Sequence, residues 1–98
     1  MTKTSEIVIN RLQENKIRYW AGDNISDHLE EGDKERLIDE AAVAFEGVLD
    51  SLVIDRHNDP NSMDTGRRLA KMYFNELMAG RYDVKPNATA FPNQGDNG

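Results

Sequence analysis

The chain has 98 residues, with 18 acidic and 12 basic side chains, so its formal net charge is −6. This length fits one domain at most, and a chain of this size buries about 65% of its unfolded surface, enough for one modest core. The sequence contains no cysteine, which excludes disulfides, thiol nucleophiles and cysteine-bound zinc within these residues. It has no apolar run near the ~20 residues of a membrane-spanning helix and no signal-like stretch near its start, so we expect a cytoplasmic protein without membrane contact.

Charge is distributed unevenly along the chain. Residues 1–32 carry a net charge of −2, residues 33–64 a net −6 and residues 65–98 a net +2. The acidic middle and the basic last third are therefore expected to attract each other or a partner. Basic residues cluster only around positions 67, 68 and 71, which is too few for a surface that follows a phosphate backbone. The charge pattern therefore argues against nucleic-acid binding.

The spacing of apolar residues predicts three helices, and the first lies near the N-terminus. Ile7, Val8 and Leu12 fall at i, i+1 and i+5 of this helix, and a Thr and a Ser at positions 4 and 5 are available as its N-cap. We expect the helix to end before residue 16. The following stretch, residues 21–34, is rich in Gly, Asp and Asn, which predicts a loop with at most one short turn.

The second predicted helix, from Asp33 to Leu52, has the clearest pattern. Asp33 and Glu35 stand in its first turn, where the helix dipole favours negative charge. Residues 55–62 then form a turn-rich connection. The apolar stripe of this helix recurs in steps of three and four: Leu37, Ile38, Ala41, Phe45, Val48, Leu49 and Leu52.

The third predicted helix runs from about Gly66 to Ala79. Thr65 can cap its first N–H groups, and Gly80 stands where a left-handed residue would end it. The second and third helices are expected to pack as an antiparallel pair, closed at one end by the first helix and Trp20.

The predicted fold class is therefore all-α. We expect a small three-helix domain over residues 1–82 and an extended or disordered tail over residues 83–98, which has too few apolar residues to offset its ordering entropy. Replacement of Phe45 by Ala is expected to cost about 3–5 kcal/mol if it lies in the core. The expected core consists of Phe45, Leu49, Leu52, Leu69, Met72, Tyr73 and Leu77.

No self-contained catalytic cluster is visible in the sequence. Asp55, His57 and Asp59 have a spacing that could present three metal ligands, but a polar turn capped by Asp and Asn side chains is the favoured interpretation. Glu46 and Asp50 share a helix face and would suit a glycosidase-like pair only inside a cleft, so a solvated face is favoured. We therefore predict no catalytic, cofactor-binding or metal-binding residue.

Two other features could bind a partner or an anion. Trp20, next to Tyr19, could anchor a partner surface through its large contact area, or it could fold back as a lid on the core, which is favoured. Arg67, Arg68 and Lys71 could hold an anion at the start of the third helix. The favoured alternative is that they pair with the acidic second helix.

From Tyr19 onward the sequence resembles the N-terminal helical region of the GTP cyclohydrolase I family. The segments GDNIS at residues 22–26 and Phe-Pro-Asn at residues 91–93 fit, and the most specific stretch is VLDSLVIDRHNDPNSMDTGRRLAKMYFNELMAGRY, residues 48–82. Many family members have Pro where this chain has Gly66, and Gly is expected to leave that helix start looser by ~1 kcal/mol. The family signature Thr-Pro-x-Arg-(Ile/Val)-Ala-Lys-Met-Tyr is matched by Thr65, Arg68, Ala70, Lys71, Met72 and Tyr73.

The resemblance implies an activity, and it also implies that residues needed for that activity are missing from this chain. Family members convert GTP to 7,8-dihydroneopterin triphosphate and formate, at the head of tetrahydrofolate or deazapurine synthesis, as rings of subunits that share sites. A sheet-containing domain supplies the zinc ligands, two Cys and a His, and a zinc-activated water attacks the purine. None of these ligands can be assigned here, because the chain has no cysteine. We therefore expect no cofactor in this chain and no activity from it alone.

Three interpretations of the resemblance stay open. The first is a truncated or split GTP cyclohydrolase I-like protein that binds its missing catalytic half. The second is a small helical interaction module that binds an intact GTP cyclohydrolase I, and the third is a relic without a present role. In the first two the expected partner is a protein: the catalytic half, intact subunits or a second copy of the chain.

Overall fold

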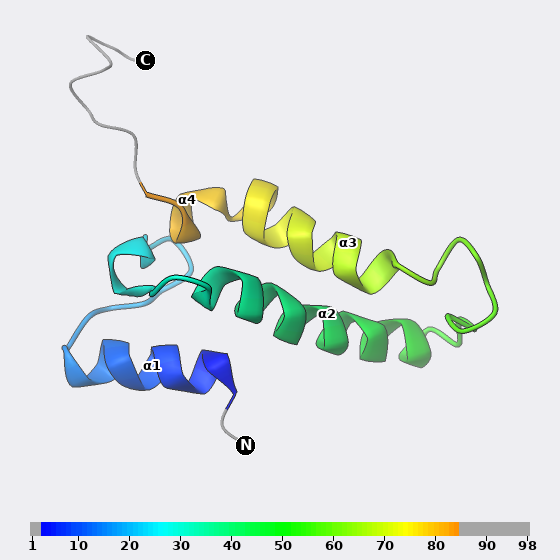
Figure 1. Cartoon of the computed structure of the whole chain (residues 1–98), viewed down its shortest axis with the longest axis horizontal. Helices are drawn as coiled ribbons and strands as arrows, with labels where there is room; N and C mark the ends of the chain where they lie inside the picture. Colours follow the sequence, from blue (N-terminus) through cyan, green and yellow to red (C-terminus); the bar gives the residue numbers. More distant parts are fainter. Residues whose placement is uncertain (1–2, 85–98) are drawn as a thin grey trace, which may run out of the picture.

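The computed structural model of the protein describes residues 3–84, which form helices and connecting loops without a strand (Figure 1). The all-α fold class is confirmed. Most of the predicted tail, including Phe-Pro-Asn at 91–93, lies outside the described residues. The elements in chain order are α1 (Thr4–Glu14), the 3₁₀ turn η1 (Ser26–His28), α2 (Asp33–Ser51), α3 (Thr65–Met72), the π-helical turn η2 (Tyr73–Leu77) and α4 (Ala79–Tyr82).

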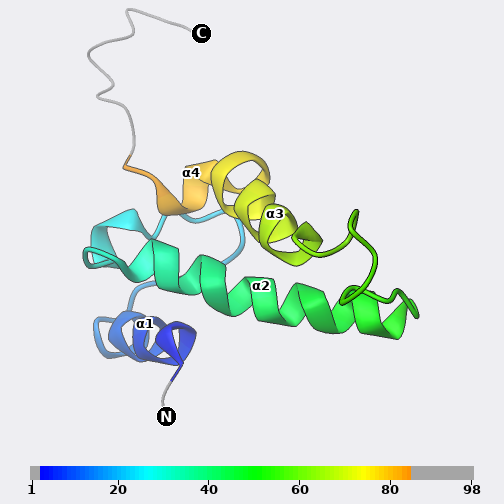
Figure 2. The same cartoon turned by 45° about the vertical axis from the view of Figure 1, so that its right-hand side comes forward.

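Helix α2 is the centre of the molecule. It lies between α1 and α3 in both views, and both of these helices run antiparallel to it (Figures 1 and 2). The predicted antiparallel pair is therefore confirmed as α2 and α3. Two ion pairs cross from the acidic α2 to the more basic last third: Arg67 with Asp39, and Lys34 Nζ with Asp83 Oδ1 at 2.6 Å. The Arg67–Asp39 pair has the polarity expected from the charge pattern, while in the Lys34–Asp83 pair the cation lies on α2 and the acid in the last third.

Helix α1 begins at Thr4, so its cap lies at least one residue earlier than predicted. Lys3 is the N-cap, and its backbone N–H donates to the Glu6 carboxylate at 3.0 Å, so the Thr and Ser at positions 4 and 5 lie inside the helix. The helix ends at Glu14, and the side-chain amide of the C-cap residue Asn15 donates to the Arg11 carbonyl at 2.7 Å. Lys16 then takes a positive φ of 57°, which turns the chain away from the helix axis.

Helix α2 has the predicted start and ends within one residue of the predicted end. It follows Gly32, whose φ of 86° is accessible to glycine at little cost, and Asp33 and Glu35 occupy the first turn. At the other end, Leu52 is the C-cap and Val53 has a φ of 63°. A β-branched residue rarely adopts this left-handed conformation, so the end of α2 stores strain at Val53.

The third predicted helix is more complex than its sequence pattern. Thr65 is the first residue of α3 rather than its cap, and its hydroxyl donates to the Asn61 carbonyl at 3.1 Å. The predicted left-handed stop at Gly80 is wrong, because Gly80 lies inside α4. The chain instead widens into η2, where the Met78 N–H donates to the Tyr73 carbonyl at 2.8 Å. This i→i+5 bond is typical of a π-turn.

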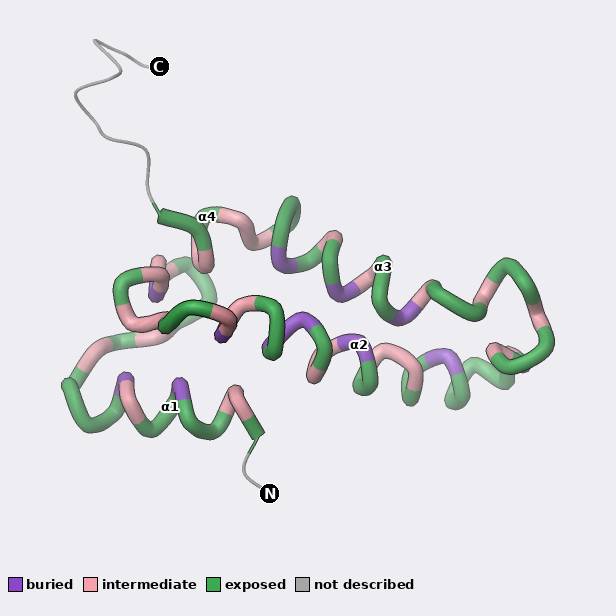
Figure 3. Tube along the Cα trace, viewed as in Figure 1, coloured by how far each residue is buried: buried purple, intermediate pink, exposed green. Residues whose placement is uncertain are grey.

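The buried core consists of two clusters. Buried positions lie on the sides of α1 and α3 that face α2 (Figure 3). Leu29 and Tyr82 pack against both clusters and join them. One cluster contains Leu37, Ile38, Ala42, Ala70 and Phe74, and the other contains Val8, Leu12 and Ile25.

Much of the expected core is not buried. Leu49 is buried, while Phe45, Leu69 and Met72 are half-buried. Three further members are exposed: Leu52 by 63%, Tyr73 by 40% and Leu77 by 61%. The prediction was wrong because the side of α3 that faces α2 carries small residues, Gly66 and Ala70, together with Phe74.

Gly66 is the point of closest approach between α3 and α2. A Cβ atom at this position would lie 2.9 Å from Cγ of Glu46 and 3.0 Å from the carbonyl oxygen of Ala42. Both distances are too short for an undisturbed contact, so the two helices approach this closely because residue 66 has no side chain. In the sequence, Gly66 stands out only as a replacement for Pro that loosens the start of the helix. The structure adds a packing reason for glycine at this position.

Candidate functional site

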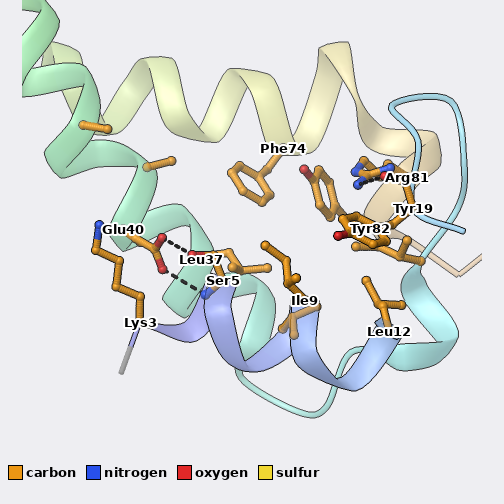
Figure 4. Close-up of a pocket in the computed structure, with 14 residues that line it drawn as sticks. Lys3, Ser5, Ile9, Leu12, Tyr19, Leu37, Glu40, Phe74, Arg81 and Tyr82 are labelled. Atoms are coloured by element: carbon orange, nitrogen blue, oxygen red, sulfur yellow. Dashed lines mark hydrogen bonds between the residues drawn. The ribbon is translucent and has the colours of Figure 1, made fainter. Parts of the chain in front are cut away.

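A cavity of about 350 Å³ opens between α1, α2 and the segment from Phe74 to Tyr82 (Figure 4). Its lining is mainly apolar, and its volume lies in the range of small-ligand pockets. Ser5, Val8, Ile9 and Leu12 of α1 form one wall, and Leu37, Ala41 and Ala44 of α2 form the floor. The other lining residues are Lys3, Tyr19, Ile25, Glu40, Phe74, Arg81 and Tyr82.

One end of the cavity is closed by a hydrogen-bonded pair. The Glu40 carboxylate accepts hydrogen bonds from the Ser5 N–H, at 3.0 Å, and from the Ser5 hydroxyl (Figure 4). This pair ties the start of α1 to the middle of α2. Because both carboxylate oxygens have partners, Glu40 holds the two helices together rather than standing free as a base.

The other end of the cavity is organised by Arg81. Its guanidinium donates to the carbonyl oxygens of Tyr19 and Asp23, both at 3.1 Å, and to that of Trp20. The Ile25 N–H donates back to the Arg81 carbonyl at 2.7 Å. One side chain therefore fastens the loop of residues 19–25 to α4.

Trp20 is 69% exposed, so the predicted lid on the core is wrong. The physical reason is that Arg81 binds the carbonyls of Tyr19, Trp20 and Asp23, which holds the backbone of this loop against α4 and leaves the ring on the outside. Arg18 lies 4.3 Å above the ring centroid and forms a two-pronged pair with Asp23 at 2.8 and 2.9 Å. The hydrogen bond from Arg18 lowers the pKa of the Asp23 carboxyl.

Asp33 is the one buried charged residue in the described part of the chain. Its carboxylate accepts hydrogen bonds from Arg11 at 3.0 Å, from Arg36 at 2.8 Å and from the Glu30 N–H at 2.8 Å. Burial alone raises the pKa of this carboxyl, but the N–H and the two guanidinium groups outweigh it and lower the pKa to about 2. The network joins α1 to the start of α2.

The six residues of the family signature are divided between packing and exposed positions. Ala70 is fully buried against α2, and Met72 is half-buried. Thr65 and Arg68 hold the preceding loop, since Arg68 donates to Oγ1 of Thr65 at 3.2 Å and to the Asn61 carbonyl at 3.3 Å. The two remaining members, Lys71 and Tyr73, are exposed.

Residues 55–62 have the predicted turn character. Asp55 accepts hydrogen bonds from Asn58, which lower the pKa of its carboxyl, and Asp59 accepts from the Asn61 N–H and the Ser62 hydroxyl. Both carboxylates are thus used inside the loop. In the part of the chain that the structure describes, no three His, Cys, Asp or Glu side chains are grouped as a metal site requires.

The remaining charged candidates pair with each other. Arg56 Nε donates to Asp50 at 2.9 Å, and the Arg56 guanidinium lies 3.9 Å from Glu46, so these two carboxylates belong to a surface ion-pair group. Arg67 pairs with Asp39, as the favoured alternative to an anion site predicts. Lys71, the third member of that predicted anion site, is exposed.

An exposed apolar face continues the floor of the cavity. On α2, Ala41, Ala44, Val48 and Leu52 recur in steps of three and four, which places them on one side of the helix. The ring of Phe45 stacks on that of Tyr73 at 5.3 Å between centroids. Leu69 and Leu77 lie four residues before and after Tyr73, which places them on the same side of α3 and η2. We define the apolar face as Ala41, Ala44, Phe45, Val48, Leu52, Leu69, Tyr73 and Leu77.

Sequence reasoning found most of these residues but assigned them to the core. The signal that distinguishes buried from exposed apolar positions is residue size on α3, where Gly66 and Ala70 mark the side that contacts α2. By contrast, Lys3, Ser5 and Glu40 at the end of the cavity carry no sequence pattern that would have identified them.

None of the protein-family models, curated proteins or solved structures compared with this chain matches it. The resemblance to GTP cyclohydrolase I therefore stays a prediction. Among residues 3–84, no helix has the length and apolar character needed to cross a membrane.

Proposed function

We propose that this chain is the helical module of a GTP cyclohydrolase I-like protein and that it acts by docking on a polypeptide that carries the catalytic zinc domain. The observation that supports docking is the apolar face, where Val48, Leu52 and Leu77 are each at least half exposed. Apolar side chains that lie together on a surface mark interaction sites in soluble proteins. The substrate class, GTP, comes from the resemblance alone.

The donor set of this chain does not fit the zinc site of that family. No cysteine is present, and the two histidines, His28 in η1 and His57 in the loop before α3, lie at opposite ends of the described structure (Figure 1). No chemical step can therefore be assigned to residues of this chain. Its role in the proposal is to complete the assembly that holds the catalytic domain in its active form.

The experiment combines the purified chain with a GTP cyclohydrolase I catalytic domain that lacks its own helical region, together with zinc and GTP. Formate release and pteridine fluorescence are expected from the mixture and from neither component alone. A matched pair of variants tests the surface, because Val48 and Val43 are both exposed valines of α2 but only Val48 belongs to the apolar face. Val48→Asn is expected to weaken complementation and Val43→Asn to leave it unchanged; a mixture without activity and without co-elution at micromolar concentrations would overturn the proposal.

A second candidate function is modulation of an intact GTP cyclohydrolase I. The Asp33 and Arg81 networks favour it, because they connect α1, the 19–25 loop, α2 and α4 within this chain without a contribution from a catalytic domain. Under this alternative the chain changes the rate or subunit number of the intact enzyme without complementing the isolated domain. Adding the chain to intact enzyme and measuring both quantities separates the two functions.

A further inference from the structure

The cavity between α1, α2 and the segment from Phe74 to Tyr82 is apolar in its middle and polar at its ends. Ile9 and Phe74 lie between Glu40 at one end and Arg81 at the other (Figure 4). Water finds few hydrogen-bond partners against apolar walls, so burial of an apolar molecule there is favourable. One water in the liquid takes up about 30 Å³, so the cavity, of about 350 Å³, corresponds to about twelve non-hydrogen atoms. The cavity therefore suits a ligand whose apolar body has about eight to ten carbon atoms.

Arg81 is a cation of the cavity lining that has no carboxylate partner. At most three of the five N–H groups of its guanidinium donate to carbonyl oxygens of the 19–25 loop, which leaves at least two for a ligand. Asp23 supplies one of those carbonyls but uses its carboxylate for Arg18, at 2.8 and 2.9 Å. Within residues 3–84, Arg81 forms no ion pair, although it is only partly exposed. Because a guanidinium pairs well with a carboxylate through parallel hydrogen bonds, this end of the cavity favours a carboxylate.

The other charged groups of the lining do not oppose an anion at the Arg81 end. Lys3 is a second cation, and Glu40, at the opposite end, uses both carboxylate oxygens for Ser5 (Figure 4). Two cations and one carboxylate therefore line the cavity, although the whole chain has a net charge of −6. Salt screens exposed charges beyond about 10 Å, so the nearby charges decide which ligand is attracted. The local charge thus favours an anionic ligand.

We propose that this cavity binds a straight-chain aliphatic carboxylate of about eight to ten carbons, with its chain against the apolar walls and its carboxylate on the Arg81 guanidinium. This inference does not depend on the cyclohydrolase proposal, since the cavity lies within this chain and needs no catalytic domain. Carboxylate binding without complementation would overturn only the cyclohydrolase proposal.

The test is isothermal titration calorimetry of the full chain with octanoate, 1-octanol and octylamine, which share an eight-carbon chain and differ in charge. Octanoate is expected to bind with a Kd below about 1 mM. The neutral alcohol and the cationic amine are each expected to bind at least about tenfold more weakly, because neither supplies an anionic acceptor to the guanidinium. Equal or tighter binding of the alcohol or the amine overturns the proposal, as does the absence of octanoate binding up to about 5 mM.

A matched pair of variants on α2 locates the site. Ala41 is half-buried and lines the cavity, whereas Val43 is 67% exposed and does not belong to the lining. Ala41→Leu fills space that the ligand needs and is expected to weaken octanoate binding at least about tenfold, while Val43→Leu is expected to leave it unchanged. Circular dichroism checks that both variants keep the fold. Equal effects of the two substitutions overturn the proposal.

Arg81→Met tests where the carboxylate lies. Loss of the contacts to the 19–25 loop weakens binding of acid and alcohol alike, so the informative quantity is the ratio of their two Kd values. This ratio is expected to fall from about ten in the parent chain to about one in Arg81→Met. An unchanged ratio would overturn the assignment of the carboxylate to Arg81. The three ligands and the Ala41→Leu pair decide the proposal in the parent fold if Arg81→Met does not fold.

Discussion

Phe45 and Tyr73 stack at 5.3 Å between ring centroids with 26° between their planes, and this pair forms the boundary between the buried core and the apolar face. Phe45 is half-buried and packs against the core cluster on one side, while Tyr73 is 40% exposed on the other. A stacked aromatic pair contributes about 0.5–1.5 kcal/mol beyond the area it buries. The pair therefore closes the core without itself being a full part of it.

This boundary predicts unequal costs for neighbouring substitutions on η2. Phe74→Ala is expected to lower the free energy of unfolding by about 3–5 kcal/mol, because Phe74 is 9% exposed and also stacks on Tyr82 at 4.4 Å. Leu77→Ala, at a position 61% exposed, is expected to cost less than about 1 kcal/mol. Urea unfolding followed by circular dichroism measures both, and equal losses would contradict the assignment of Leu77 to an exposed face.

Gly66→Ala is expected to destabilise the protein although alanine favours helices. The helix propensity gain is at most ~1 kcal/mol, whereas overpacking against the Ala42 carbonyl and the Glu46 side chain costs about 1–3 kcal/mol. Thermal unfolding of Gly66→Ala should therefore show a lower Tm. Gly80→Ala is the control, because no atom lies within 4 Å of a Cβ at that position, and its Tm should stay equal or rise.

The order of elements could be predicted from the sequence because it depends on local signals. The apolar period and the acidic first turn located α2, and segments rich in Gly, Asp and Asn before it and in Asp and Asn after it located the loops on either side. The helix faces could not be predicted equally well. An apolar stripe indicates that a helix face is hydrophobic, but the small residues Gly66 and Ala70 decide which side of α3 packs against α2.

The contacts at the two ends of the cavity could not be predicted from sequence patterns. The Arg81 contacts join residues about 60 positions apart in the chain, and the Ser5–Glu40 pair joins residues 35 positions apart. Neither spacing follows a helical or turn period. Asp33 was predicted as a dipole-favoured residue of the first turn, yet its burial with Arg11 and Arg36 depends on how α1 docks.

The buried Asp33 predicts a loss of stability in acid. Its folded-state pKa of about 2 lies below the ordinary value of 3.8, so its contribution is complete above pH ~5 and is lost as the pH falls from about 4 through 2. A difference of this size corresponds to ~2 kcal/mol. Urea unfolding between pH 7 and pH 2 should show this loss in the parent chain and a flatter profile in Asp33→Asn, which is less stable at pH 7. Asp27→Asn, at an exposed position, is the control and should follow the parent profile.

The three carbonyl contacts of Arg81 predict that this side chain holds Trp20 in place. Arg81→Met keeps much of the aliphatic stem but leaves the carbonyls of Tyr19, Trp20 and Asp23 without their charged donor, which is expected to cost about 2 kcal/mol. Trp20 is the single tryptophan of the chain, so its fluorescence reports this loop alone. Anisotropy decay of the parent should show an indole that tumbles with the whole molecule, and Arg81→Met should add a fast component of loop motion. Arg18→Met removes only the cation above the ring and should change the emission without the same gain in loop motion. If Arg81→Met leaves the anisotropy decay unchanged, Arg81 does not fasten the loop.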